Sequence, residues 1–252
     1  MKKQPGKEIE NIHGEGFLKN TAIDAVIFGF HDDQLKVLLI EYKRTGLFAL
    51  PGGFIRDDED INDAAMRVVS ERTGLSDIYL DQFYVFGDYS RFDPSPLKKI
   101  MEANGNHPPE DHWLLKRFIS IGYYALVDFT KVVPSPAAIF DSCRWYDLDK
   151  MPQLIQDHAL IVKKALFTLR ANLDHKLIGF NLLPAEFTLG ELQRLYETIL
   201  DRKLIRPAFQ RKMLALGILV RIAKKMTGGA HKAPYLYRFK PEGNAIAPEN
   251  PQ

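Results

Sequence analysis

Residues 53–75 read GFIRDDEDINDAAMRVVSERTGL, and the rest of the chain can be interpreted outward from this stretch. The turn at residues 50–52 precedes it, and proline followed by glycine is typical of a break between elements. From Asp60 to Thr73 apolar residues recur at helical spacing, and Gly74 suits the left-handed position that ends a helix. The stretch therefore predicts a turn, a polar loop and one amphipathic helix.

The segments around residues 53–75 alternate between strand-like and irregular patterns. Runs rich in β-branched and aromatic residues predict strands at Thr21–Phe30, Lys36–Tyr42, Gln82–Tyr89, Ile119–Phe129 and Arg144–Leu148. His31-Asp32-Asp33 is a polar turn that predicts a hairpin between the first two strands. Arg91–Lys116 holds four prolines and is predicted to be a long loop with a binding role, a plain surface insertion being the alternative. A mixed α/β domain is expected to close near Met151.

The C-terminal part follows a different pattern of elements. Helices are predicted at 157–173, 188–200 and 207–217, followed by strands at Leu219–Ala223 and Tyr235–Phe239. Thr188 and Glu191 form a capping box at the start of the second helix. Pro207 suits the first turn of the third helix, and Gly217 suits its end. Two helices joined by a short turn and followed by a hairpin are typical of a winged helix-turn-helix.

Composition and charge predict a polyanionic partner and a reducing compartment. The 252 residues are 46% hydrophobic and 26% charged, and the formal net charge is +2. Between Arg202 and Lys240 there are eleven Lys or Arg and no Asp or Glu, which leaves 23 basic against 32 acidic residues elsewhere. Such asymmetry favours a polyanionic partner for this segment. The single Cys143 and the polar N-terminus predict a cytoplasmic location, with no membrane association.

The stretch 53–75 resembles the signature of the Nudix superfamily of pyrophosphohydrolases. The positions that fall in register with that signature are Gly53, Glu59, Arg67, Val69, Glu71, Gly74 and Leu75. Val68 and Arg72 stand where the family places carboxylates that hold a metal ion. Magnesium prefers hard oxygen ligands, so the resemblance implies that only Glu71 could still coordinate it.

The altered motif implies a site without metal chemistry. Arg72 would repel a cation, whereas a guanidinium pairs well with phosphate and suits a metal-free anion site. We therefore predict no catalytic residue, no metal and no cofactor here. Glu59 and Arg67 are interpreted as an ion pair that braces the loop against the helix.

A second resemblance covers about residues 20–240. Phe86–Pro94 and Arg117–Val127 are similar to segments that follow the Nudix box in Nudix-related transcriptional regulators. That family pairs a Nudix-like sensor with a winged helix, and its members respond to ADP-ribose and related NAD metabolites or to sugars such as arabinose. The resemblance implies an α+β chain, with a Nudix-like mixed-sheet α/β/α sandwich followed by a winged helix-turn-helix domain. The expected divisions are an arm at 1–20, the sensor at 21–155, the winged helix at 156–241 and a disordered tail at 242–252.

Candidate residues follow for both predicted sites. For the effector, a sugar or sugar-nucleotide, they are Arg44, Phe48, Arg56, Asp88, Arg91, Arg117 and Tyr123. In the helix beginning at Pro207, the face with Phe209, Met213 and Leu216 is expected to be buried, which turns Arg211 toward the DNA major groove. The full set of expected DNA contacts is Lys203, Arg206, Gln210, Arg211, Lys212, Lys224, Lys225, His231 and Lys232.

Three functions remain open from the sequence. The favoured hypothesis is a ligand-responsive repressor that binds duplex operator DNA as a homodimer, because paired winged helices recognise paired half-sites. The alternative is an active Nudix hydrolase of nucleoside diphosphate-linked substrates such as ADP-ribose. A third possibility is a sensor whose basic end docks an acidic protein. The sequence leaves the identity of the effector and of the operator open.

Overall fold

The computed structural model describes residues 14–75, 78–130, 140–174, 182–225 and 233–240. The chain divides into two compact units, one ending at Asp174 and the other beginning at His175. The boundary predicted between residues 155 and 156 is wrong, because helix α3 (His158–Asn172) packs on the sheet of the first unit. Within the described ranges, every helix is too short or too polar to span a lipid bilayer.

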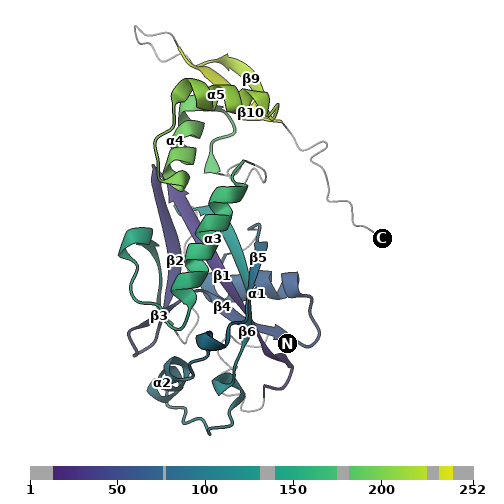
Figure 1. Cartoon of the computed structure of the whole chain (residues 1–252), viewed down its shortest axis with the longest axis vertical. Coiled ribbons are helices and arrows are strands. Elements are labelled where there is room, and N and C mark those ends of the chain that lie inside the picture. The colour runs from purple at the N-terminus through teal and green to yellow at the C-terminus, as the bar shows by residue number, and fades with distance from the viewer. Residues whose placement is uncertain (1–13, 76–77, 131–139, 175–181, 226–232, 241–252) are drawn as a thin grey trace. The chain divides into compact units, whose positions relative to one another are not determined.

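The first unit is built on a mixed sheet that has seven strands among the described residues (Figure 1). The strands are β1 (Phe17–His31), β2 (Gln34–Tyr42), β3 (Leu47–Ala49), β4 (Gly52–Arg56), β5 (Asp81–Phe86), β6 (Ile119–Asp128) and β7 (Phe140–Asp147). β1 lies at the centre. It pairs with β6 in parallel along one edge, while β2 and β4 pair antiparallel with the two halves of its other edge.

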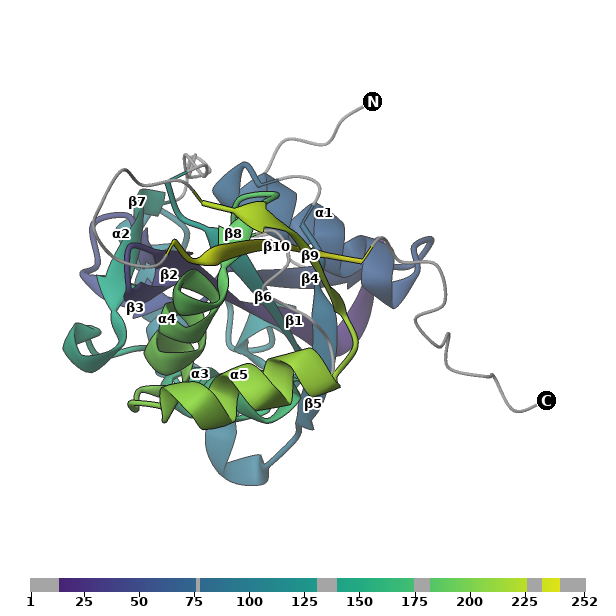
Figure 2. The same ribbon diagram turned by 90° about the horizontal axis from the view of Figure 1, so that it is seen from above.

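Helices cover both faces of this sheet. Residues Ile23–Phe30 of β1 are buried without interruption, as expected of a strand that is covered on both sides. Ala25 and Ile27 pack with Val69 of α1 (Ile61–Thr73), and α3 contacts β1, β5 and β6. Figure 2 shows α1 and α3 on opposite sides of the strands. This arrangement confirms the predicted α/β/α sandwich.

Two segments of the first unit differ from the predictions. The arm expected at 1–20 is a strand from Phe17 onward, and its residues 1–13 lie outside the described ranges. The loop expected at 91–116 contains helix α2 (Ser95–Ala103) and the short helix η2 (Trp113–Leu115). Its prolines suggested a break, but Pro96 lies in the first turn of α2, where no hydrogen bond is lost.

The second unit contains the helices α4 (Leu189–Leu200) and α5 (Arg206–Ala215) and a three-stranded sheet. In the order of the sheet, its strands are β8 (Phe187–Thr188), β10 (Tyr235–Phe239) and β9 (Leu219–Lys224). Thr188 and Glu191 form the predicted capping box, with both reciprocal hydrogen bonds present. The order of helices and strands confirms the winged helix fold. The tail at 242–252 lies outside the described residues.

The core of the second unit joins the two helices to the sheet. Phe209 and Met213 of α5 are buried as predicted, and the Phe209 ring packs against that of Tyr196 on α4. Leu216, also expected in the core, is 40% exposed. It follows the last residue of α5 and precedes Gly217, whose φ of 67° turns the chain away from the helix.

Candidate functional site

The frame of the 53–75 stretch is held by arginine–carboxylate pairs. Arg67 donates from Nε to Glu59 across 2.8 Å, and its terminal nitrogen donates to the carbonyl oxygen of Phe54 across 2.8 Å. Burial favours a higher pKa for Glu59, but the hydrogen bonds from Arg67 and from the Arg56 N–H lower that pKa below its ordinary value. The predicted brace between loop and helix is confirmed.

Glu71 forms ion pairs with Arg56 and Arg67. Its two carboxylate oxygens lie 3.3 Å from Arg56 and 3.1 Å from Arg67. Among the described residues, no group of three or more His, Cys, Asp or Glu side chains is placed to hold a metal ion. A cation near Glu71 would meet the positive charge of two guanidinium groups.

Of the two altered motif positions, Val68 packs against the turn and Arg72 places a positive charge beside it. Val68 is 1% exposed and packs so closely on the turn that a Cβ atom at Gly53 would come within 2.8 Å of it. Arg72 is 4% exposed, and its Nε donates a hydrogen bond of 3.1 Å to the carbonyl oxygen of Gly52. Its guanidinium also lies 5.6 Å from the centre of the Phe140 ring. A fixed positive charge is therefore buried beside the turn.

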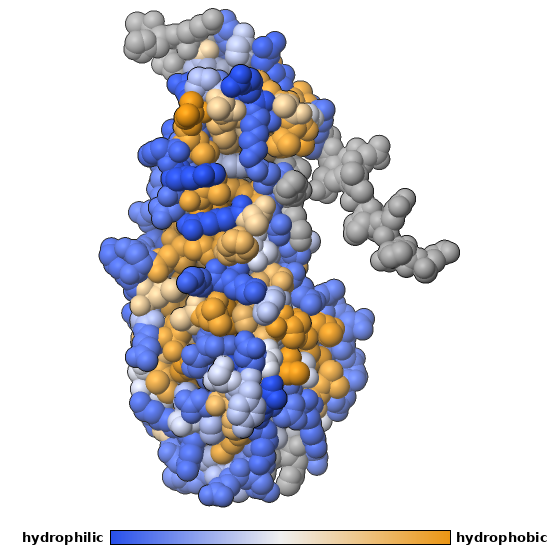
Figure 3. Space-filling view, viewed as in Figure 1, coloured by the Kyte–Doolittle hydropathy of each residue, from blue (hydrophilic) through white to orange (hydrophobic). Residues whose placement is uncertain are grey.

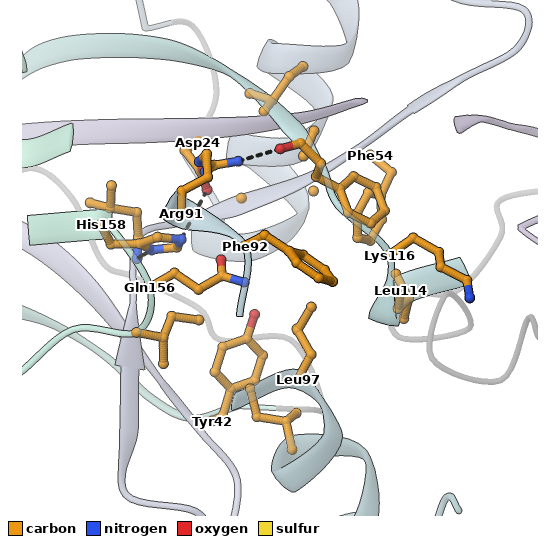
Figure 4. Close-up of a pocket in the computed structure, with 18 of the residues that line it drawn as sticks. Asp24, Tyr42, Phe54, Arg91, Phe92, Leu97, Leu114, Lys116, Gln156 and His158 are labelled. Carbon is orange, nitrogen blue, oxygen red and sulfur yellow. Dashed lines mark hydrogen bonds and ion pairs between the residues drawn. The ribbon is translucent and has the colours of Figure 1, made fainter. Parts of the chain in front are cut away.

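Arg72 borders a pocket that we call the Arg72 pocket (Figure 4). Strands β1 and β4, helices α1, α2 and η2, and the start of α3 all contribute to its lining. One wall is apolar, and its side chains include Phe54, Phe92, Leu97 and Leu114. The acidic, basic and histidine side chains of the lining are Asp24, Arg72, Arg91, Lys116 and His158. With three basic groups against one acidic group, the pocket favours an anionic ligand that also has an apolar or aromatic part.

Arg91 separates the Arg72 pocket from a neighbouring, more open one. It ends the short helix η1 (Tyr89–Arg91) and binds both carboxylate oxygens of Asp157, at 2.9 and 3.1 Å. Another of its nitrogens donates to the carbonyl oxygen of Phe118 across 2.8 Å. Because its side chain is only 7% exposed and already paired, Arg91 braces the pocket wall.

The polar end of the Arg72 pocket contains Asp24 and His158, which lie near each other in Figure 4. Asp24 accepts a short hydrogen bond from Ser120, and its other carboxylate oxygen lies 3.7 Å from His158 Nε2. The Nδ1 atom of His158 accepts the backbone N–H of Leu50 across 3.0 Å. These groups come from β1, β6 and the first turn of α3.

The seven predicted ligand residues do not gather at one place. Only Arg91 lines the Arg72 pocket, and Asp88 lines the neighbouring one. Arg44 lies on an exposed turn, Arg56 binds Glu71, Arg117 donates to Gly87, and Phe48 packs on Tyr146. Tyr123 is 1% exposed within a core cluster and donates to Asn62, so the structure corrects its assignment as a stacking surface.

Asp24, Lys116 and His158 were missed as pocket residues. The one available signal was Asp24, a charged residue inside the apolar run TAIDAVIFGF. An acid in a strand buried on both faces requires a partner or a function. His158 and Lys116 carried no such signal, because their role depends on how distant segments meet.

Of the predicted DNA-binding side chains that the structure describes, all but Gln210 are exposed on the second unit. On α5, Arg206, Arg211 and Lys212 are exposed and Gln210 is half-buried. Lys224 and Lys225 are exposed on β9 and just after it, whereas His231 and Lys232 lie outside the described residues. Lys203 and Lys225 are bound to Glu197 at 2.9 Å and Glu191 at 3.1 Å. We therefore regard Arg206 and Arg211 on α5 as stronger candidates than Lys203 and Lys225.

Two further features of this surface were missed. Arg221 on β9 lies over the Tyr235 ring at 4.6 Å, which adds a cation beside the predicted wing. Figure 3 shows hydrophobic side chains among the hydrophilic ones in the region of α4 and α5. Ile205 and Leu214 are 77% and 50% exposed, so the surface combines charge with apolar contact area.

Two family models match the chain. The model for the NUDIX domain matches residues 19–166, and the model for the NrtR DNA-binding winged helix domain matches residues 179–239. Each match falls largely within one of the two units, and the stretch 53–75 lies inside the first.

Two of the proteins similar to the chain match most of its length, and a third matches less than half of it. A protein of Acinetobacter baylyi described as "ADPR responsive transcriptional repressor NtrR" is 29% identical over 224 residues, which are 86% of this chain and 80% of the relative. A crystal structure of Shewanella oneidensis NrtR complexed with a 27mer DNA is 26% identical, with a TM-score of 0.63, and covers 88% of this chain and 94% of that one. An RNA pyrophosphohydrolase of Erythrobacter litoralis is 31% identical over 117 residues, 46% of this chain and 68% of the relative.

Proposed function

The chain belongs to the NUDIX domain family, as a Nudix-related transcriptional regulator with an NrtR winged helix domain, and from this premise we propose that it is a repressor controlled by an ADP-ribose-like effector. The effector binds in the Arg72 pocket, and the winged helix binds duplex operator DNA. The observation that carries the proposal is Arg72 itself, a buried guanidinium at a motif position where the enzymes of the family keep a carboxylate.

The DNA-binding part rests on α5 and the strand that follows it. Phe209 and Met213 anchor one face of α5 in the core, and Arg211 and Lys212 are exposed on the rest of the helix. Arginine suits guanine in the major groove, and neighbouring cations suit phosphate. The similarity to NrtR in complex with DNA supports the same role for this chain.

The effector class follows from the charge of the Arg72 pocket. A diphosphate offers partners to Arg72 and Lys116, and a base or sugar can pack on the Phe54 and Phe92 wall. A neutral pentose such as arabinose would leave these cations without a ligand anion. We therefore favour a sugar-nucleotide, in agreement with the ADPR-responsive relative.

We also propose that the Nudix-like unit lacks hydrolytic activity. The position of one expected carboxylate is filled by Val68 against Gly53, and Glu71 is paired with two arginines. The described part of the unit therefore offers no cage of oxygen ligands for the metal ion that offsets phosphate charge.

An active hydrolase is the second candidate, and two observations favour it. Glu71 remains on α1 and is 22% exposed in its side chain, and the chain resembles an RNA pyrophosphohydrolase over 46% of its length. Incubation of ADP-ribose with the protein and Mg²⁺ separates the two candidates. Turnover at an ordinary enzymatic rate, lost in Glu71→Gln, would establish the hydrolase.

Coupling between effector and DNA is proposed to pass through α3. Asp157 and His158 at its start contact the walls of the Arg72 pocket, and its last residue, Asn172, precedes the second unit in the chain. A ligand that moves the η1 wall therefore acts on the helix leading to the winged helix. In a homodimer, which we also propose, such a shift changes the spacing of two recognition helices.

DNA binding is tested first with fluorescent duplexes drawn from the genomic region around the gene. The account expects binding whose affinity falls steeply as salt is raised, because exposed cations displace counterions from phosphate. A protein that binds none of these duplexes at low salt, but captures an acidic protein, would support the docking alternative instead.

A further inference from the structure

The polar end of the Arg72 pocket holds two buried groups that face each other without bonding. Oδ1 of Asp24 and Nε2 of His158 are 3.7 Å apart, beyond the length of a hydrogen bond. Both side chains are at least nine-tenths buried, with 10% and 8% of their surface exposed. Both residues also line the pocket, so a ligand group can reach the gap between them.

The donor and acceptor roles of this pair are determined by its other contacts. Nδ1 of His158 accepts the Leu50 N–H across 3.0 Å, which leaves the imidazole proton on Nε2. Oδ2 of Asp24 accepts from Ser120. Among the described residues, no donor lies within hydrogen-bonding distance of Oδ1, the oxygen that faces His158. The gap therefore offers one acceptor and one N–H donor side by side.

Glycine at position 52 keeps the acceptor accessible. A Cβ atom at Gly52 would come within 2.7 Å of Oδ1 of Asp24, closer than such atoms approach. The same residue supplies the carbonyl oxygen that receives the Arg72 hydrogen bond. Gly52 therefore lies against both Asp24 of the pair and the buried Arg72.

We propose that Asp24 and His158 form a subsite for a sugar hydroxyl of the effector. A hydroxyl is the common group that donates and accepts at once, so it donates to Oδ1 and accepts from Nε2–H. Neither a phosphate, which repels the carboxylate, nor an ammonium, which cannot accept, satisfies both partners. The inference rests on the proposed function and specifies how the Arg72 pocket recognises the ribose part of a sugar-nucleotide.

The experiment measures binding by calorimetry in the presence of a chelator. The ligands are ADP-ribose, ADP, and ADP-ribose analogues that each lack one ribose hydroxyl. For the native protein, one analogue is expected to bind about 10- to 100-fold more weakly than ADP-ribose, as for a lost hydrogen bond to a charged group. For Asp24→Asn, the affinity for ADP-ribose is expected to fall by a similar factor. The affinity of this variant for that one analogue should fall little below the native value, because the analogue already lacks the interaction.

Two variants of His158, one without the Nε2 donor and one with a replacement for it, test the other half of the subsite. His158→Asn keeps an acceptor near the Leu50 N–H but removes the Nε2 donor, whereas His158→Gln presents an amide donor near the Nε2 position. The subsite predicts weaker ADP-ribose binding in the first variant and recovery in the second. Thermal unfolding followed by tryptophan fluorescence verifies that each variant folds, since Trp113 and Trp145 both lie in the first unit.

Two results would overturn the subsite, and they are distinguishable. If Asp24→Asn lowers the affinity for ADP-ribose and for every analogue by the same factor, the Asp24 side chain does not contact a ribose hydroxyl. The proposed function would still stand. If the native protein binds neither ADP-ribose nor ADP at millimolar concentration, the effector class is wrong and the subsite is rejected with it.

Discussion

Arg72 Nε donates a hydrogen bond to the carbonyl oxygen of Gly52 across 3.1 Å, which joins the last turn of α1 to the start of β4. This contact holds a guanidinium, 4% exposed, at the border of a pocket whose other basic side chains are Arg91 and Lys116. Under the proposed function, this guanidinium supplies the positive charge for which an enzyme of the family uses a metal ion. Four predictions follow from this difference and from the contacts around it.

Removal of the Arg72 charge should weaken binding of the effector, and this binding should not depend on a metal ion. For Arg72→Gln we expect ADP-ribose to bind about 10- to 100-fold more weakly, as for the loss of a charged hydrogen-bonding partner. Calorimetry with Mg²⁺ and with EDTA should give the same affinity for the native protein. Arg56→Gln is the control, because Arg56 lies on β4 but does not line the Arg72 pocket; an equal loss there would contradict the role of Arg72.

Loss of the Glu71 carboxylate should leave regulation intact. Because Glu71 is paired with Arg56 and Arg67, Glu71→Gln should lower stability slightly and leave the affinity for ADP-ribose and for DNA unchanged. The measurement is DNA binding by fluorescence anisotropy with and without ADP-ribose. A variant that folds but no longer responds to ADP-ribose would argue that Glu71 takes part in ligand binding.

The brace between Glu59 and Arg67 should stabilise the first unit in a pH-dependent way. Although burial raises the pKa of Glu59, its hydrogen bonds from Arg67 and Arg56 hold the folded-state value below the ordinary 4.5. A depressed pKa means that the stabilisation is complete above about pH 4.5 and is lost as pH falls through the folded value. Glu59→Gln should therefore cost about 2 kcal/mol at neutral pH and progressively less below pH 4.5.

Urea unfolding followed by tryptophan fluorescence provides this measurement, since both tryptophans report on the first unit. The midpoint difference between native protein and Glu59→Gln is recorded at neutral pH and at about pH 3.5, chosen below the ordinary carboxyl pKa. A difference that stays constant, or grows, as the solution becomes more acidic would show that the pair does not act through the Glu59 charge.

Arg211 on α5 should determine DNA affinity without affecting the sensor. Arg211→Ala is expected to weaken duplex binding about 10-fold or more, as for one lost bidentate base contact. Lys163→Ala removes an exposed cation from α3 and serves as the charge-matched control. Equal losses in both variants would point to unspecific attraction of the whole surface, and ADP-ribose binding should remain native in each.

The elements with local signals could be predicted from the sequence. The β1–β2 hairpin follows from its polar turn, α1 from its apolar spacing and Gly74, and the start of α4 from the capping box at Thr188. Each of these signals lies within a few residues of the structure it specifies. The helix α3 was also predicted, but its apolar face does not say which unit it covers, and the domain boundary was therefore misplaced.

The pocket could be predicted only in part. The unusual residue at position 72 was recognised from the motif, and its pairing with Gly52 is a consequence of where α1 ends. Asp24 and His158 belong to β1 and α3, segments far apart in the sequence, and only the packing of α3 on the sheet brings them together. Tyr123 was misassigned because alternation along β6 does not reveal which face of the strand meets the core helix α1.

The most direct test of the account is the affinity of the native protein for its operator duplex, measured by anisotropy in EDTA as ADP-ribose is added. The account predicts that ADP-ribose changes this affinity at least about 10-fold, a coupling typical of allosteric sites, and that Arg72→Gln requires far more ligand for the same change. Arabinose should leave the affinity unaltered. An operator affinity that is indifferent to ADP-ribose, or that responds only when Mg²⁺ is restored, would contradict the central claim of a metal-free sensor built around Arg72.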